Sequence, residues 1–278
     1  MPVIAMTQEM GSLGKDVAMH LAQSLNLQVM RHEVVDHIAE QMDKPKSTIR
    51  RVRQGKASFV ERFTIDQRDL AIYTAEEVCE LAERGNIILR GWGATCILRP
   101  VPHVACIRIT RSFDKRVEWL MANLGINDAE LAGAEIRRSD TAHASRIQQL
   151  YGVKWGDPML YDLVLNMDRL SVESAAEQIK VLVSRPEFQE TPQSMAKLKN
   201  LTLEAEIRAA LRHHPATHNT SVTIDVSGNG EVILNGIVLS ETERKEVEKL
   251  AAAVPGVHRI DNNLRPMKTS KLFPSAKE

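Results

Sequence analysis

Hydrophobic residues along this chain gather in short continuous runs, separated by stretches in which they recur every three or four positions. Continuous runs of this length predict buried strands, and the spacing of three and four predicts amphipathic helices. The predicted strands span residues 3–6, 27–30, 87–89, 104–109 and 161–166. The predicted helices between and after them span residues 17–25, 34–39, 65–84, 113–124 and 172–183. This order predicts an α/β fold, in which helices flank both faces of a five-stranded, mostly parallel sheet.

The pattern changes after residue 183. Residues 184–199 are mostly polar, contain Pro186 and Pro192 and show no apolar periodicity, which predicts a linker. Beyond it, a helix is predicted at 203–211, strands at 221–226 and 232–238, a helix at 241–253 and a strand at 257–264. We therefore expect one domain over residues 1–183, a small αββαβ domain over 200–266 and a basic tail over 267–278.

The first strand leads through a glycine-bearing turn into the first helix. Such a turn, with a lysine opening the helix, is typical of phosphate-binding loops, because backbone amides and the positive end of the helix dipole meet an anion there. The predicted nucleotide-binding residues are Gly11, Ser12, Leu13, Gly14, Lys15 and Asp16. The match to G-x-x-x-x-G-K-[ST] is partial, since Glu9 replaces the first glycine and Asp16 the hydroxyl residue. The alternative is an ordinary strand-to-helix turn in which Lys15 is solvated.

Further cations and glycines follow at places where a second phosphate compound can bind. Arg51 and Arg53 lie in a basic segment over residues 46–64, and a phosphate acceptor favours such cations. Gly91-Trp92-Gly93 directly follows a buried strand, where ligands of open α/β sheets bind. A polar, helical stretch over residues 127–156 carries Arg137, Arg138 and Arg146, which can close over a transferring phosphoryl group. For each arginine, a solvated helix face is the alternative.

Composition narrows the class of protein. The net charge is zero and the isoelectric point is about 7.1. The chain therefore lacks the excess of basic residues that would indicate nucleic acid as a partner. No hydrophobic run reaches the length of a membrane span, and no signal peptide precedes the first strand. Three widely spaced cysteines in apolar contexts favour free thiols in a reducing compartment. We therefore expect a cytoplasmic protein.

Both halves of the chain resemble known families. Residues 1 to about 183 resemble the cytidylate kinase-like family of P-loop nucleoside monophosphate kinases. The run from Glu9 to Asp16, Gly91-Trp92-Gly93-Ala94 and the late run from Trp155 to Asn166 carry this resemblance. Residues 200–265 resemble a BON domain, through Asn229-Gly230, the run from Val232 to Gly236 and the run from Val254 to Val257.

The first resemblance implies transfer of the γ-phosphoryl group of ATP to CMP or a related nucleoside monophosphate. It implies that amides of residues 11–14 hold the donor phosphates and that Lys15 neutralises them. Mg²⁺ with ATP is the implied cofactor, and Asp16 is the implied metal residue. Arg137, Arg138 and Arg146 would act in catalysis with Lys15, and Arg51, Arg53, Gly91, Trp92 and Gly93 would receive the acceptor.

Several positions depart from the family pattern. Leu13 replaces a glycine, Trp92 and His143 replace arginines, and Arg31-His32 replaces an Asp-Arg pair. The loss of a group that stabilises the transferring phosphoryl costs a factor on the order of a hundred or more in rate. The alternative is thus a catalytically degenerate, nucleotide-binding regulatory or scaffold protein, whose BON-like domain binds a partner, a lipid or itself. The acceptor base and the oligomeric state stay open.

Overall fold

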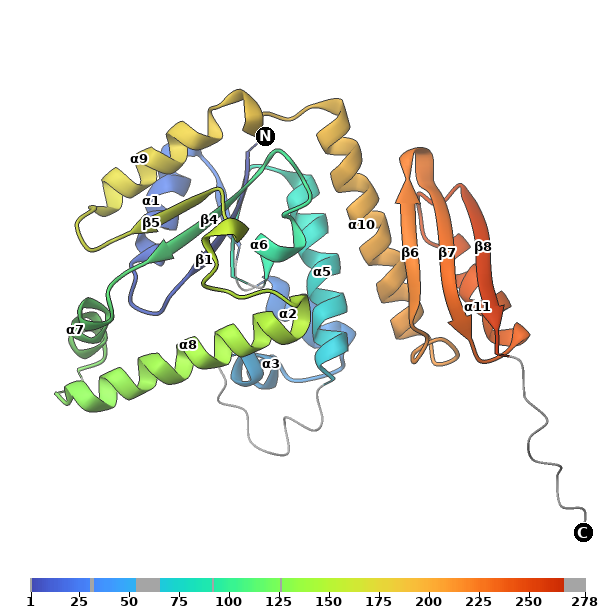
Figure 1. The fold of residues 1–278 in the computed structure, drawn as a ribbon, viewed down its shortest axis with the longest axis horizontal. Helices are drawn as coiled ribbons and strands as arrows, with labels where there is room; N and C mark the ends of the chain where they lie inside the picture. Colours follow the sequence, from blue (N-terminus) through green and yellow to red (C-terminus); the bar gives the residue numbers. More distant parts are fainter. Residues whose placement is uncertain (1, 31–32, 54–65, 92, 126, 268–278) are drawn as a thin grey trace, which may run out of the picture. The chain divides into compact units, whose positions relative to one another are not determined.

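The computed structural model describes residues 2–30, 33–53, 66–91, 93–125 and 127–267 (Figure 1). Two compact units divide the chain, Met1–Lys199 and Asn200–Glu278. Arg31, His32 and Trp92, as well as residues 54–65 of the predicted basic segment, lie outside the described residues.

A single parallel sheet forms the centre of the first unit. Its strands are β1 (Val3–Gln8), β2 (Gln28–Met30), β3 (Ile87–Arg90), β4 (Val104–Thr110) and β5 (Leu163–Asn166). They lie in the order β2-β3-β1-β4-β5, and every neighbouring pair is parallel. The predicted α/β fold with a five-stranded sheet is therefore confirmed. Since β1 lies in the middle, the turn that follows it opens at the carboxyl edge between β3 and β4.

Helices cover both faces of this sheet (Figure 1). The helices of the first unit are α1 (Gly14–Leu25), α2 (Glu33–Gln41), α3 (Lys46–Arg53), α5 (Gln67–Arg84), α6 (Ala94–Ile97), α7 (Phe113–Leu124), α8 (Ala129–Tyr151) and α9 (Val172–Val183), whereas α10 (Pro192–His213) begins at the end of this unit and continues into the second. Helices α1 and α9 lie side by side on one face, whereas α5 and α6 pack against β3 and β1 from the other. Helix α8 packs against α7 and, farther along, against α5.

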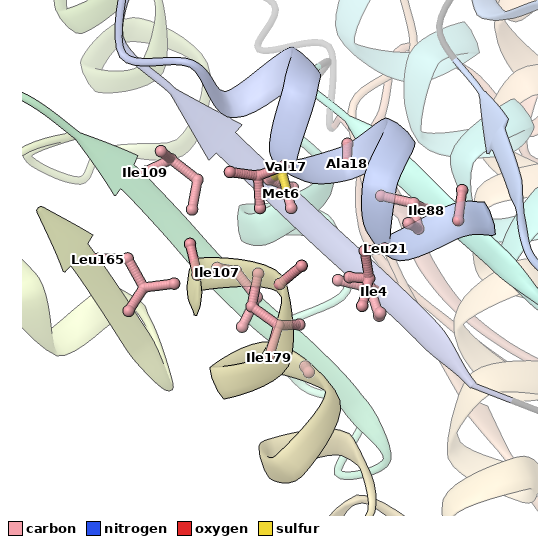
Figure 2. Packing of buried hydrophobic residues seen from close by; sticks show 14 of the residues in the cluster. Ile4, Met6, Val17, Ala18, Leu21, Ile88, Ile107, Ile109, Leu165 and Ile179 are labelled. Carbon is pink, nitrogen blue, oxygen red and sulfur yellow. The ribbon is translucent and has the colours of Figure 1, made fainter. Parts of the chain in front are cut away.

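One hydrophobic core lies between the sheet and the α1–α9 pair (Figure 2). Alternate residues of the strands, such as Ile4, Met6 and Ile107, point toward α1 and α9, because side chains alternate across a strand. Leu21 of α1 and Ile179 of α9 meet them and are fully buried. This packing fixes the start of α1 at the end of β1, and the loop between them is the start of the candidate site.

The segment predicted as a linker contains regular structure. A short 3₁₀ helix spans Pro186–Phe188, and α10 already begins at Pro192. Proline is well suited to the first turn of a helix, where its missing N–H has no partner to lose. Thr191 and Ser194 cap the start reciprocally, and the Ser194 hydroxyl lies 2.8 Å from His103 Nδ1. Pro186 and Pro192 therefore begin helices and do not mark an unstructured linker.

The second unit is a small two-layer domain. The strands β6 (Val222–Ser227), β7 (Glu231–Val238) and β8 (Arg259–Pro266) form one sheet with α10 and α11 (Glu241–Ala252) as its helices. Strands β6 and β7 are antiparallel, and β7 and β8 are parallel. Ile207, Leu234 and Val247 form its core. The predicted αββαβ order is confirmed. Across the described ranges of both units, no helix combines the length and hydrophobicity that crossing a bilayer requires.

Candidate functional site

The loop between β1 and α1 has a backbone suited to anion binding. Gly11 and Leu13 both have positive φ angles, 79° and 64°, with Ser12 between them. The Ser12 hydroxyl and N–H both donate to the Glu9 carbonyl, at 2.8 and 3.3 Å, which closes the turn. No side chain caps the start of α1, so the first N–H groups of the helix remain directed at the loop. Such a concave set of amides at a positive helix end is a typical phosphate site.

Two glycines of this loop are required by close contacts. A Cβ atom at residue 14 would lie 2.6 Å from Gln8 Oε1 and 2.8 Å from Gln8 Cβ. A Cβ atom at residue 11 would lie 3.1 Å from the Arg116 carbonyl oxygen. The loop is therefore held tightly between β1 and α7, with Gly11, Ser12 and Gly14 buried and Leu13 half-buried.

Lys15 and Asp16 occupy the first turn of α1, and both side chains are exposed. The lysine provides a cation next to the loop amides, and the aspartate is a carboxylate one position further. Among the described residues, no cluster of three or more histidines, cysteines or carboxylates forms a ready metal cage. Asp16 is a carboxylate of the type that holds Mg²⁺ together with substrate phosphates.

A network of buried charges supports the loop from the β4 side. Glu9 Oε1 accepts from Arg108 Nη2 at 2.7 Å, and Oε2 accepts from Thr110 Oγ1 at 2.6 Å. Arg116 of α7 lies 3.7 Å from Glu9 and donates two hydrogen bonds to Asp140 of α8, at 3.1 and 2.6 Å. Burial raises the pKa of Asp140, and the charge of Arg116 opposes that rise.

Sequence reasoning gave no role to Arg108, Arg116 and Asp140. A usable signal was present in the strand 104–110, where Arg108 interrupts an otherwise apolar run. A buried cation of this kind requires a partner. The sequence alone could not identify that partner, because Glu9 is 99 positions away.

The turn after α8 packs against this network. Trp155 donates from Nε1 to Thr7 Oγ1 at 3.0 Å, and the Arg108 guanidinium lies 4.3 Å from the centre of its ring. The Tyr161 hydroxyl donates to the Trp155 carbonyl at 2.7 Å, and burial raises the pKa of Tyr161 to about 12. His143 of α8 lies with its ring centre 4.3 Å from that of Trp155. The position where the resemblance implies an arginine therefore carries an imidazole ring, tilted by 53° against the Trp155 ring.

A small cavity of about 70 Å³ lies beside Gly93. Residues of α5, of α8 and of the turn after β3 line it. Arg146 and Tyr151 are its polar side chains from the end of α8, and burial lowers the pKa of Arg146 and raises that of Tyr151. A Cβ atom at residue 93 would lie 2.3 Å from the Tyr151 hydroxyl oxygen, so only glycine fits there.

The predicted arginines of α8 have separate partners. The Arg137 guanidinium lies 5.1 Å from the centre of the Phe113 ring, and Arg138 pairs with Glu135 at 2.7 Å on an exposed surface. Arg146 donates to the Val52 carbonyl at 2.6 Å, which connects α8 to α3. Arg137 and Arg138 are both exposed. A catalytic role for these three residues stays a prediction.

The predicted acceptor residues are described in part. Arg51 lies on α3 and donates to Thr48 Oγ1 at 3.2 Å. Arg53 ends α3, but its side chain is outside the described part of the structure, as is Trp92. Gly91 and Gly93 adopt positive φ angles of 78° and 70°. Arg90, which precedes them, donates to Gln8 Oε1 at 3.2 and 3.1 Å and so joins the ends of β3 and β1.

Comparison with known proteins supports the resemblance of both halves. The model of the cytidylate kinase-like family matches residues 3–169, and the BON domain model matches residues 200–265. The cytidylate kinase of Pyrobaculum islandicum is 26% identical over 181 residues, which cover 63% of this chain and 89% of that protein. The crystal structure of an uncharacterized protein from Eubacterium ventriosum covers 66% of this chain and 99% of its own, with a TM-score of 0.53 and 22% identity, and supports the fold.

Proposed function

Because the chain belongs to the cytidylate kinase-like family through residues 3–169, we propose that it is a phosphotransferase that moves the γ-phosphoryl group of ATP to CMP or a related nucleoside monophosphate. The observation that carries the proposal is the loop over residues 11–14. Its alternating left-handed residues and the uncapped start of α1 supply amides for a polyphosphate, next to the ammonium group of Lys15.

In this proposal the acceptor phosphate attacks the γ-phosphorus while the bond to the β–γ bridging oxygen breaks, which yields ADP and a nucleoside diphosphate. Lys15 neutralises negative charge on the donor phosphates. Asp16 would hold Mg²⁺, directly or through water, and the ion would neutralise further phosphate charge. The acceptor would enter beside Gly93, at the cavity lined by Arg146 and Tyr151. Arg137 and Arg138 would act only after α8 moves, since their present partners are elsewhere.

A second function is favoured by one observation. His143 stands at the position of a family arginine and lies against Trp155, where it adds no permanent cation to the site. The second proposal is therefore a catalytically degenerate protein that binds nucleotide and reports its presence to a partner. In this version the BON domain binds that partner, a lipid or a second copy of the chain. In the second unit of this chain, the side chains of Ile237 and Leu239 are 67% and 71% exposed. These two residues are candidates for such a contact.

One experiment separates these functions. A coupled assay of ADP release with Mg·ATP and CMP, UMP, dCMP or AMP should give acceptor-dependent turnover, highest with CMP. The Lys15→Ala variant should lose it, and His143→Arg should increase it, because the variant restores a cation. Turnover with none of the four acceptors, together with calorimetric binding of Mg·ATP, would favour the degenerate protein. Absence of both would reject nucleotide binding altogether.

A further inference from the structure

Glu9 is an unusual residue at the edge of a proposed phosphate site, because a carboxylate repels the anion that the loop would bind. Nevertheless, each of its hydrogen-bonding groups has a partner. Its N–H donates to the Ile109 carbonyl at 3.3 Å, and its own carbonyl accepts both bonds from Ser12. Its carboxylate accepts from Arg108, from Thr110 and from the Arg111 N–H, the last at 3.3 Å. The residue is thus fixed at both its main chain and its side chain.

The two arginines extend these contacts to α8 and to the turn after it. Arg108 joins Glu9 to Trp155, since its Nη1 donates to the Trp155 carbonyl at 3.0 Å. Arg116 joins Glu9 to Asp140 on α8. The side chains of Arg108 and Arg116 are only 8% and 5% exposed. Two buried cations and two carboxylates balance here, and the removal of Glu9 would leave a buried cation without full compensation.

The same network reaches the glycine loop by a second route. The backbone of Arg116 lies against Gly11, so close that a Cβ atom on residue 11 would meet the Arg116 carbonyl at 3.1 Å. Arg116 therefore lies between Glu9 and the loop, because its side chain is 3.7 Å from the Glu9 carboxylate and its main chain lies against Gly11.

We propose that Glu9 is a positioning residue, which orients the phosphate-binding amides through Arg108, Thr110 and Arg116. This inference rests on the proposed nucleotide binding by the same loop. The proposal predicts in which direction the affinity for nucleotide changes when the charge of Glu9 is removed. Electrostatics alone requires that removal of a negative charge beside a polyanion site strengthens binding. Positioning requires that the same removal weakens it.

The test is calorimetric titration of the full chain with Mg·ADP. The variant Glu9→Gln keeps the shape and one acceptor oxygen but removes the charge, and we expect binding at least about tenfold weaker, equal to about 1.4 kcal/mol. Glu9→Asp keeps the charge on a shorter side chain and should also weaken binding. Asp114→Asn is the matched control, because Asp114 is an exposed carboxylate in the first turn of α7. This variant should bind Mg·ADP within about twofold of the unsubstituted chain.

The outcomes separate this proposal from the proposed function. Equal or tighter binding of Mg·ADP by folded Glu9→Gln would overturn the positioning role while leaving nucleotide binding intact. No binding by the unsubstituted chain would instead reject the proposed function and, with it, the site that Glu9 is said to position. If Glu9→Gln does not fold, Thr110→Val gives the same comparison, since it removes one donor to Glu9 and keeps all four charges. Weaker binding by Thr110→Val supports the proposal, and unchanged binding overturns it.

Discussion

The left-handed backbone of Leu13 gives a quantitative prediction about the loop. Its φ angle of 64° places a residue with a Cβ atom in a region that costs roughly 1–2 kcal/mol. Leu13→Gly removes this cost, whereas Leu13→Ala keeps it. Both variants lose the leucine side chain beyond Cβ, so they differ mainly in the backbone cost. Glycine also has more conformational freedom than alanine in the unfolded chain, which lowers the stability of the glycine variant by about 0.4–1 kcal/mol. Leu13→Gly should therefore be more stable than Leu13→Ala by up to about 1.6 kcal/mol.

Urea unfolding followed by tryptophan fluorescence measures this difference. All three tryptophans lie at positions 92, 119 and 155, so the signal reports the first unit and not the second. The comparison uses two variants at one position, which cancels most of the uncertainty in extrapolation. A Leu13→Ala variant more stable than Leu13→Gly would refute the left-handed conformation. Leu13→Gly should also bind Mg·ADP within about threefold of the unsubstituted chain, because leucine already adopts the conformation that glycine permits.

Two further predictions concern other contacts of the first unit. Gly93→Ala should destabilise it by about 2–5 kcal/mol, the sum of left-handed strain and overpacking against Tyr151. In a Tyr151→Ala background the cost should fall to about 1–2 kcal/mol in urea unfolding, and an unchanged cost would contradict the contact. His37 lies 3.0 Å from Glu76 and 3.2 Å from Glu77, and its hydrogen bond to Glu76 raises its pKa above 6.5. Its stabilising contribution is therefore complete below pH 6.5 and lost as the pH rises through the raised value, so His37→Gln should destabilise more at pH 6 than at pH 9. Equal losses of stability at pH 6 and pH 9 would contradict the raised pKa of His37.

The sequence predicts the centre of the sheet well because β1, β3 and β4 are buried on both faces. Continuous apolar runs such as 104–109 are unambiguous in this setting, and helical spacing identifies the elements between them. The end of β1 is predicted less well. The strand continues through Thr7 and Gln8, two polar residues whose side chains are held by Trp155 and Arg90. Such partners come from distant parts of the chain, so local pattern cannot reveal them.

The candidate site, like the sheet, is predictable where its residues are adjacent in sequence, and not where they meet only in the fold. The glycine loop is recognisable because strand, turn and helix are contiguous in sequence. Glu9, in contrast, reads as a mismatch to the phosphate-loop pattern, and only the fold brings Arg108 and Arg116 to it. Sequence also identifies Arg137, Arg138 and Arg146 as cations of one helix. It cannot tell which surface each reaches, because that depends on how α8 lies against α3, α5 and α7.

The central claim is that the amides of residues 11–14 and the ammonium group of Lys15 bind the phosphates of a nucleotide. Titration of the full chain with Mg·ATP in a calorimeter, beside the Lys15→Ala variant, tests it most directly. The account predicts one binding site per chain and at least about tenfold weaker binding in the variant. Absence of binding by the unsubstituted chain, or equal affinity of both proteins, would contradict it.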